Sequence, residues 1–463
     1  MLLQEVEFGV GPEELFDVLC DRPPCFFLDS ALSVGGLGRF SFIGFDPFVV
    51  FCARGDEITL TQDGRTEMHR GDVILELRRL FERYCAPAST ALPFASGAVG
   101  YFSYEFGLRF EGIARSSADD LGIPEVELGL YDGVLAFDLA SKRTFIVANS
   151  VAGSDEQTIV QRVESTVRGA LIRGRAARPE MRSPAAVHAP RANFTKETYL
   201  GAIVRIKDYI AAGDVYQVNL SQRFEMPLPC HPYELYRRLR RRSPAPFASY
   251  LNFGERQMVS SSPERFLRLQ NGRVETRPIK GTRRRGTDRV EDAELGRQLL
   301  ASDKDRAELL MIVDLERNDL GRVCEFGSIR VDELYRLETH PTVFHLVATV
   351  SGRLRPGADI FDCLRAAFPG GSITGAPKIR AMQIIDELEP HRRHIYSGAI
   401  GCIGFDGNCD LNIAIRTIQC VGGRAYYHVG GGIVWDSDPE SEYQETLDKG
   451  CAMHAALVEE LRL

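Results

Sequence analysis

Apolar and polar positions alternate in short runs through the first third of the chain. Gly, Pro and Asp separate these runs, a pattern typical of antiparallel strands. Apolar residues three and four positions apart interrupt the pattern and predict helices. The predicted strands are 25–28, 40–43, 48–52, 57–61, 97–101, 133–138 and 143–147, and the predicted helices are 12–19, 72–84 and 155–173.

The rest of the chain mixes longer helical patterns with strands. Residues 175–192 are rich in Arg, Ala and Pro with little periodicity, and are interpreted as a linker between regions 1–174 and 193–463. The fold class is therefore α+β. The predicted elements after the linker are helices 199–210 and 236–242, strands 215–224 and 274–279, mainly helices over 291–395, strands 398–405, 411–420 and 425–429, and a terminal helix 440–461.

Composition narrows the function classes. The 463 residues are 44% hydrophobic and 26% charged, as in globular proteins. The net charge of −8 disfavours a general nucleic-acid binder, and no run approaches the roughly 18 apolar residues of a membrane span. The 11 cysteines form no Cys-x-x-Cys pair, so neither a zinc site nor a disulfide framework is expected. The acidic N-terminal segment matches no targeting signal, and a cytoplasmic setting is expected.

One lysine lies in an unusually constrained stretch. Lys280 follows Pro278 and Ile279 and precedes Gly281. Proline fixes its own φ, and glycine permits backbone that other residues resist. An amine held in this way is a candidate nucleophile if burial or nearby positive charge lowers its pKa. A surface lysine in a turn is the alternative.

Two predicted helices carry acidic pairs at helical spacing. Asp305 and Glu308 share one helix face, and Glu442 and Glu445 repeat the spacing before Lys449. If the pairs meet, a cation with oxygen ligands, such as Mg²⁺, would neutralise them. Solvated helix faces are the alternative.

Four further features are ambiguous individually. The loop 368–378 opens onto a helix whose N–H groups suit an anion, and Gly430–Gly432 permit close approach of a ligand. His345, in an apolar segment, is ordinarily a core histidine. Arg416 lies among apolar residues on a predicted strand, and a buried arginine needs an anionic partner such as a substrate carboxylate.

Taken together and in order, these motifs resemble one family. Ser261–Glu264, Pro278–Thr282, Val313–Leu320, His345–Val347, Gly375–Lys378 and Gly430–Val434 resemble the chorismate-utilising enzymes, which include the anthranilate, aminodeoxychorismate, isochorismate and salicylate synthases. The resemblance is strong over 190–463 and looser over 1–150. It implies a two-lobed fold in which antiparallel sheets form a β-sandwich core with helices outside.

The resemblance also implies a role for each matching residue. Glu308 and Glu445 are implied Mg²⁺ ligands, with Asp305 (where glutamate is usual) and Glu442 acting through water. Glu264 is placed beside the departing hydroxyl of chorismate. The implied substrate contacts are Gly431, Gly432 and Lys449 for the ring carboxylate, Arg416 and Tyr396 for the enolpyruvyl carboxylate, and His345 and Ser372.

Two positions distinguish family members. Lys280 resembles the aminodeoxychorismate synthases, whereas anthranilate synthases usually carry alanine there. Gln217 stands where water-using members have a lysine, which disfavours isochorismate-type chemistry. No glutaminase elbow with a cysteine is present, so the resemblance implies that a separate class I glutaminase subunit supplies ammonia. The alternatives are an anthranilate synthase component I and an inactive tryptophan-binding regulator.

The N-terminal region contains a possible ligand site. Asp29 and Ser30, with Arg39 and Ser41, resemble the tryptophan pocket of the synthase large subunits. In this subfamily a bound tryptophan is expected to be structural and not inhibitory, and an ordinary strand pair is the alternative.

Overall fold

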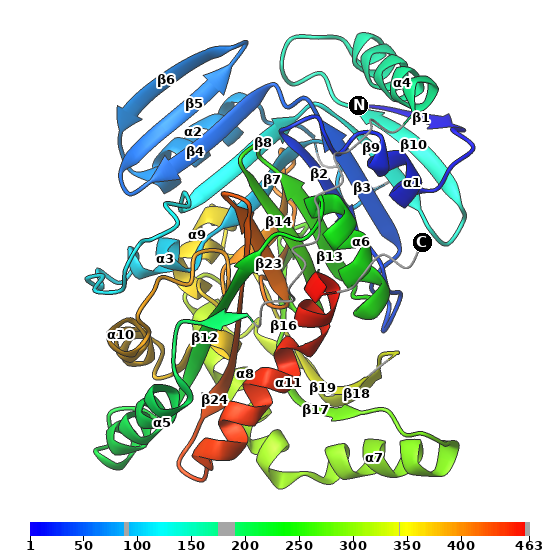
Figure 1. Cartoon of the computed structure of the whole chain (residues 1–463). Helices are drawn as coiled ribbons and strands as arrows, with labels where there is room; N and C mark the ends of the chain where they lie inside the picture. The colour runs from blue at the N-terminus through cyan, green and yellow to red at the C-terminus, as the bar shows by residue number, and fades with distance from the viewer. Residues whose placement is uncertain (88–91, 175–189, 342, 459–463) are drawn as a thin grey trace.

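Two large antiparallel sheets face each other, and helices cover their outer surfaces (Figure 1). The computed structural model describes residues 1–87, 92–174, 190–341 and 343–458. The predicted α+β sandwich is confirmed. Among these residues, no helix has the length and apolar character needed to cross a bilayer.

The first sheet runs in the order β1-β10-β9-β3-β2-β13-β14-β23-β24-β12-β11, with β20 paired to β12. Its strands are β1 (Leu2–Val6), β2 (Cys25–Asp29), β3 (Phe40–Phe45), β9 (Gly133–Asp138), β10 (Arg143–Ala148), β11 (Arg191–Ala192), β12 (Gln217–Pro227), β13 (Phe247–Asn252), β14 (Arg256–Ser262), β20 (Gly375–Ala376), β23 (Thr417–Val421) and β24 (Arg424–Ile433).

The second sheet runs in the order β17-β19-β16-β15-β22-β21-β7-β8-β4-β5-β6, with β18 paired to β19. Its strands are β4 (Val49–Arg54), β5 (Glu57–Gln62), β6 (Arg65–Arg70), β7 (Gly97–Phe102), β8 (Val126–Tyr131), β15 (Arg265–Gln270), β16 (Arg273–Arg277), β17 (Ile279–Arg284), β18 (Arg330–Thr339), β19 (Val343–Arg353), β21 (Ala399–Gly404) and β22 (Cys409–Ile413).

Helices form the outer layers. The helices are α1 (Pro12–Asp17), α2 (Val73–Arg83), α3 (Tyr104–Leu108), α4 (Glu156–Arg173), α5 (Lys196–Ala211), α6 (Pro232–Arg242), α7 (Arg289–Ala301), α8 (Asp303–Gly321), α9 (Ile360–Ala367), the 3₁₀ turn η1 (Gly371–Ile373), α10 (Lys378–Leu388) and α11 (Pro439–Val458).

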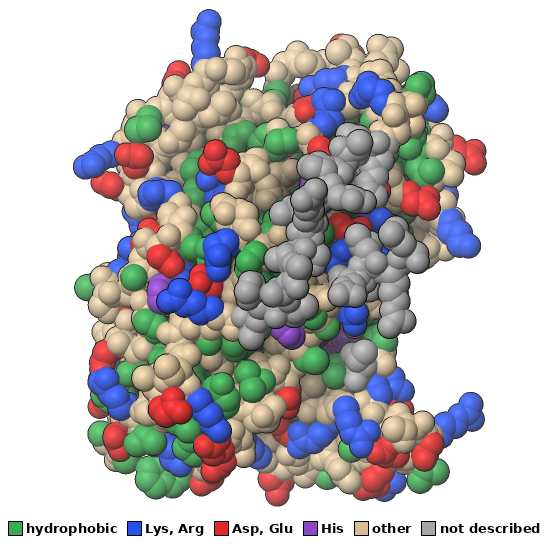
Figure 2. Space-filling model, in the orientation of Figure 1, with side chains coloured by type: hydrophobic (Ala, Val, Ile, Leu, Met, Phe, Trp, Pro, Cys, Tyr) green, Lys and Arg blue, Asp and Glu red, His purple; other side chains and the backbone are tan. Residues whose placement is uncertain are grey.

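Three apolar layers hold this arrangement together. Phe26 and Met258 of the first sheet meet Val99 and Ile400 of the second in the layer between the sheets. A second layer lies between the first sheet and α1, α4, α6 and α11, and a third lies between the second sheet and α2, α8 and α9. Lys, Arg, Asp and Glu side chains are interspersed on the face shown in Figure 2.

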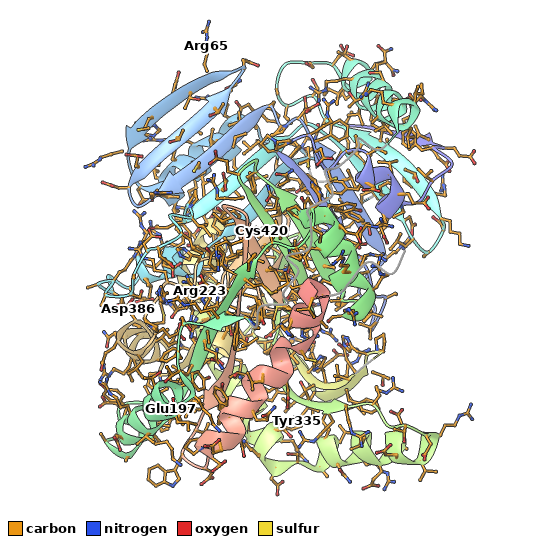
Figure 3. The ribbon with its side chains drawn as sticks, viewed as in Figure 1. Arg65, Glu197, Arg223, Tyr335, Asp386 and Cys420 are labelled. Atoms are coloured by element: carbon orange, nitrogen blue, oxygen red, sulfur yellow. The ribbon has the colours of Figure 1, made fainter. Side chains whose placement is uncertain are left out.

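Strands from both sequence regions are interleaved in each sheet. In the first sheet, β2 of the N-terminal region pairs with β13 of the C-terminal region. In the second sheet, β7 pairs with β21 in the same way. In Figure 3, the labelled Arg223 on β12 and Cys420 on β23 lie at the centre of the molecule, while Arg65 on β6 projects from its upper edge. The two regions therefore share one sandwich.

Three sequence predictions need correction. The interval 291–395 contains the long strands β18 and β19. The predicted strand 411–420 is divided, because β22 ends at Ile413 and β23 begins at Thr417 in the other sheet. Arg191 and Ala192, assigned to the linker, form β11, whereas 175–189 of that linker lie outside the described residues.

One buried ion pair joins several of these elements. Arg393 is 1% exposed and donates to both carboxylate oxygens of Glu389, at 2.8 and 2.6 Å. The same guanidinium donates to the carbonyl oxygens of Ile373 and Asn219, at 3.0 and 2.6 Å. It thereby ties η1 and β12 to the segment after α10.

We expect Arg393→Met to lower the free energy of unfolding by about 3–5 kcal/mol, because Glu389 would keep a buried charge without its partner. The matched control is Arg392→Met, which removes the neighbouring arginine and its partly exposed pair with Asp119 and should cost about 1 kcal/mol or less. Urea denaturation measures both. Equal losses in the two variants would contradict the prediction.

Candidate active site

Two chain crossings between the sheets form the floor of the site. The chain leaves β14 of the first sheet and enters β15 of the second at Pro263 and Glu264. It returns from β22 to β23 through residues 414–416, beside the first crossing. The N–H of Ile413 donates to the Glu264 carbonyl oxygen at 3.0 Å, and the N–H of Ser261 donates to the Arg416 carbonyl oxygen at 3.1 Å. Glu264 and Arg416 are thus brought together although far apart in sequence.

Lys280 approaches this floor from β17. Its neighbour Gly281 has φ of 75° and marks a shift of register against β19. A Cβ at Gly281 would lie 2.9 Å from the Cβ of Asp305, so the close approach to α8 requires glycine. The predicted glycine-dependent geometry is present, as a bulge in a strand, and such bulges re-aim neighbouring side chains.

The Lys280 amine is hydrogen-bonded to a neutral group. Its Nζ donates to the carbonyl oxygen of Ser372 at 3.0 Å. Burial lowers the pKa of Lys280; Glu308 opposes this effect, and Lys449 adds to it. The positive charge near the amine is therefore that of Lys449.

Glu264 has the opposite shift. The residue is 3% exposed, and burial raises its pKa to about 7, against the lowering effects of Ser372, Lys280 and Arg416. The N–H of Ile279 donates to its Oε1 at 3.3 Å. A carboxyl group with this pKa holds a proton near neutral pH and can act as a general acid.

His345 and Arg416 complete this side of the site. Thr282 Oγ1 and His345 Nδ1 are 3.0 Å apart, and the buried Nε2 of His345 has no hydrogen-bond partner among the described residues. Burial and the charge of Arg416 hold the pKa of His345 well below its usual range. Arg416 lies at the crossing with φ of 50°, and not on a strand as predicted. Within the described ranges no carboxylate pairs with its guanidinium, which leaves it available to an anion.

The four predicted acidic residues face the site from α8 and α11. Burial and the charges of Asp305 and Glu445 raise the pKa of Glu308 against the effects of Lys280 and Lys304, and burial raises that of Glu442. In Glu445 the effect of burial is outweighed by Lys449, 2.6 Å away, so that its pKa is lowered. Asp305 pairs with Arg283 at 3.2 Å. Glu445 thus lies near enough to Glu308 and Glu442 to raise the pKa of both, while Asp305 is paired with Arg283.

The glycine strand lies against these carboxylates. A Cβ on Gly431 would lie 3.0 Å from Glu442 Oε2 and 3.5 Å from Glu445 Oε1. The amide of Gln217 covers Gly432 so closely that any side chain there would collide with it. Lys449 Nζ donates to the Gly430 carbonyl oxygen at 2.9 Å. This wall is thus bare backbone, with a lysine at its end.

Tyr396 lies behind that wall. Its ring stacks on His428 with centroids 5.1 Å apart, and the Arg393 guanidinium lies 5.6 Å from its centroid. Burial raises the pKa of Tyr396, so its hydroxyl keeps its proton. It can therefore donate a hydrogen bond, and Asn219 lies within its reach.

The donor set fits a hard divalent cation. Glu308 and Glu445 supply carboxylate oxygens, and Mg²⁺ usually binds one or two such ligands together with water.

A second group of potential metal ligands lies away from this site. Among the described residues, the ligand atoms of Cys20, Asp21 and His231 lie within 4.8 Å of one another. There, His231 Nδ1 accepts the Tyr233 N–H at 3.2 Å, so its proton sits on Nε2, 2.9 Å from Asp21. That nitrogen has no lone pair for a metal.

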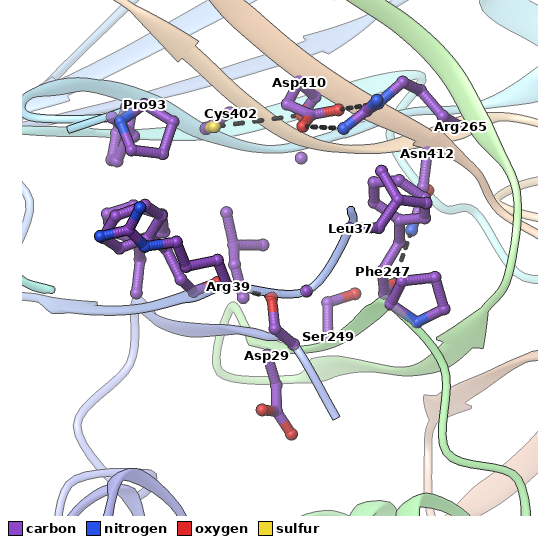
Figure 4. A pocket seen from close by; sticks show the side chains of 18 of the residues that line it. Asp29, Leu37, Arg39, Pro93, Phe247, Ser249, Arg265, Cys402, Asp410 and Asn412 are labelled. Atoms are coloured by element: carbon purple, nitrogen blue, oxygen red, sulfur yellow. Dashed lines mark hydrogen bonds and ion pairs between the residues drawn. The ribbon is translucent and has the colours of Figure 1, made fainter. Parts of the chain in front are cut away.

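A separate cavity of about 430 Å³ opens between the sheets around the predicted tryptophan residues (Figure 4). Asp29, Ser30 and Arg39 line it, and Ser41 lies behind them, donating to Asp29 at 3.3 Å. Tyr236 also donates to Asp29, at 2.7 Å. The lining includes Arg265 from β15 but neither Lys280 nor Glu264. The cavity therefore lies behind the strand that follows Glu264.

Several site residues carried no individual sequence signal. Thr282, Asn219 and Arg393 act through long-range contacts, whereas Ser372, predicted as a substrate contact, contributes its backbone carbonyl. Glu316 lies within the Val313–Leu320 motif, which by itself indicates no role for this residue.

Known proteins resemble this chain over most of its length. Residues 35–455 match the family described as chorismate binding enzyme. Aminodeoxychorismate synthase component 1 of Bacillus subtilis (strain 168) is 38% identical over 421 residues, covering 91% of this chain and 89% of the relative. Anthranilate synthase component 1 of Streptomyces coelicolor is 38% identical over 459 residues, covering 97% and 87%. The crystal structure of anthranilate synthase component I from Streptococcus pneumoniae superposes with a TM-score of 0.78 at 32% identity, covering 90% and 92%. The chain therefore belongs to the chorismate binding enzyme family.

Proposed function

We propose that the protein is an aminodeoxychorismate synthase component I, which aminates chorismate at C4 through a covalent bond to Lys280. The observation that carries this proposal is the state of the Lys280 amine, which has a lowered pKa and a neutral acceptor beside the acidic Glu264. A lysine that is partly neutral is a nucleophile.

The proposed reaction proceeds in two displacements. The Lys280 amine attacks C2 of chorismate, the ring double bonds shift, and the C4–O bond breaks as Glu264 gives its proton to the departing hydroxyl. Ammonia then attacks C4, the double bonds shift back, and the C2–N bond to Lys280 breaks. The net reaction exchanges the C4 hydroxyl for an amino group and releases water.

The remaining residues bind and orient the substrate. Arg416 and Tyr396 are proposed to hold the enolpyruvyl carboxylate, with His345 and Ser372 against the ring. The ring carboxylate lies at the Gly431–Gly432 wall near Lys449. Glu308 and Glu445, with Asp305 and Glu442 through water, would hold Mg²⁺, which would neutralise charge at that carboxylate.

Two partners follow from the same proposal. Ammonia comes from a separate class I glutaminase subunit, in line with the name "component 1" of the relatives. The cavity at Asp29, Ser30 and Arg39 is the proposed site of a structural tryptophan. Anthranilate synthase component I is the competing function, because relatives of both names match at similar identity.

The Lys280 nucleophile is tested first by mass spectrometry of the intact protein. Wild type mixed with chorismate without ammonia should gain a covalent adduct that maps to Lys280. Lys280→Ala should form no adduct, still bind chorismate, and direct any remaining amination toward C2, because C2 is no longer occupied. The matched control is Lys304→Ala, which removes an exposed lysine 3.9 Å from Glu308 and should keep the adduct. The assignment fails if Lys280→Ala yields the 4-amino product at the wild-type rate.

The raised pKa of Glu264 predicts how kcat changes on the alkaline side of the pH profile. Its acid form is needed, and a pKa of about 7 means that this form is present below that pH and is lost as pH rises through it. The kcat measured with saturating ammonia should therefore fall on the alkaline side near neutrality. Glu264→Gln cannot donate that proton and should lower kcat by about 10²–10⁴-fold. A Gln variant with wild-type kcat would remove Glu264 from the proton transfer.

The metal site is tested by charge removal at constant size. Glu308→Gln or Glu445→Gln should abolish Mg²⁺-dependent turnover while the melting temperature stays near that of wild type, because an amide is a poor ligand for Mg²⁺. Asp314→Asn is the control on the same helix, since that carboxylate pairs with Arg317 at 2.7 Å in solvent. The effect is measured as turnover at increasing Mg²⁺ concentrations. An unchanged Mg²⁺ dependence would exclude the substituted residue as a ligand.

A further inference from the structure

Glu316 is a buried carboxylate that the proposed reaction leaves without a role. It lies on α8 two turns after Glu308 and is 2% exposed. Its Oε1 accepts the N–H of Gly371 at 3.1 Å, while its Oε2 is buried without a hydrogen-bond partner among the described residues. Burial and the charge of Asp319 raise the pKa of Glu316 to about 7. Keeping such a group in the interior is costly, so its contact with Gly371 needs an explanation.

The contact anchors the turn that serves both reacting groups. η1 (Gly371–Ile373) presents the Ser372 carbonyl oxygen, which accepts Lys280 Nζ at 3.0 Å. The Ser372 side chain lies against Glu264 and lowers its pKa. A displacement of this turn would therefore move the acceptor of the nucleophile and the neighbour of the acid together.

The turn is held from two sides. On the α8 side, a Cβ on Gly371 would lie 2.6 Å from Leu315 Cδ2 and 3.1 Å from Glu316 Oε1, so the turn rests directly on the helix. On the opposite side, Arg393 donates to the Ile373 carbonyl oxygen at 3.0 Å. Glu316 is the polar attachment on the helix side.

We infer that Glu316 is a positioning residue: its carboxylate fixes the Gly371–Ile373 turn and thereby sets Lys280 and Glu264 in register with the substrate. The inference rests on the proposed function insofar as Lys280 is the nucleophile. The role depends on the reach of the side chain, not on its charge. Glu316 is not among the residues proposed to bind the substrate carboxylates. Loss of its contact with Gly371 should therefore lower kcat and leave KM for chorismate nearly unchanged.

Two substitutions separate reach from charge. Glu316→Gln keeps an oxygen at the same distance from the Gly371 N–H and should keep kcat within about 3-fold, since one neutral hydrogen bond is retained. Glu316→Asp keeps the charge but is shorter by one carbon–carbon bond, about 1.5 Å. It should lower kcat by about 10- to 100-fold with KM changed less than 3-fold, the cost of a small misplacement. Turnover is followed as chorismate consumption, whichever amino product forms.

The matched controls are Glu127→Gln and Glu127→Asp. Glu127 is equally buried, but its partners Arg256 and Tyr101 lie outside the site. Both controls should lower the melting temperature without changing kcat by more than about 3-fold. If kcat falls in proportion to melting temperature in the Glu316 variants, and the controls show the same relation, Glu316 has a structural role only.

The remaining outcomes also decide the inference. Wild-type kcat in Glu316→Asp would show that Glu316 has no positioning role. A loss in Glu316→Gln as large as in Glu316→Asp would show that the charge matters. Either outcome would overturn the inference. Acetylation of Lys280 by acetic anhydride, measured by peptide mass spectrometry, requires no turnover. Its rate should change more than 3-fold in Glu316→Asp and match wild type in Glu316→Gln, so failure of the proposed function leaves this test intact.

Discussion

The site depends on two antiparallel crossings of the chain between the sheets. A buried backbone segment outside a sheet must still satisfy its N–H and C=O groups. The segments at Glu264 and at Arg416 satisfy each other, through the Ile413 N–H and the Ser261 N–H. This pairing places a carboxyl group and a guanidinium side by side in the interior, where neither strand alone would carry them. The positive φ of Arg416 is the local cost of the arrangement.

Burial then has opposite effects on the two proposed reacting groups. It raises the pKa of Glu264 and lowers that of Lys280, because each charged form loses its hydration. The same low-polarity surroundings therefore favour a protonated acid and a neutral amine at one pH. The lysines and acids around them modulate this effect, with Glu308 and Lys449 acting on Lys280 in opposite directions. The proposed reaction requires both forms simultaneously, and a single physical cause supplies them.

Local pattern predicted much of the fold and only part of this geometry. Helix 155–173 and strand 133–138 were found because their apolar periodicity is independent of the rest of the chain. Strand β18 was missed, since it is an exposed strand paired only with β19 and has little apolar content. Arg416 was placed on one continuous strand because no local signal marks a change of sheet. Lys280 and the four acidic residues were found by motif, whereas Glu316 and Arg393 act through partners more than 50 and 170 residues away.

The choice between the two amination reactions cannot be read from the scaffold. Relatives named for either reaction are 38% identical to this chain, so the sandwich, the crossings and the carboxylate pockets suit both. In the proposed mechanism the two reactions differ in which ring carbon is open to ammonia, and that depends on a single atom, the Lys280 nitrogen. An alanine at this position would leave the surrounding charges nearly unchanged and C2 uncovered. Specificity here is therefore proposed to be a matter of blocking one carbon, with no redesign of substrate binding.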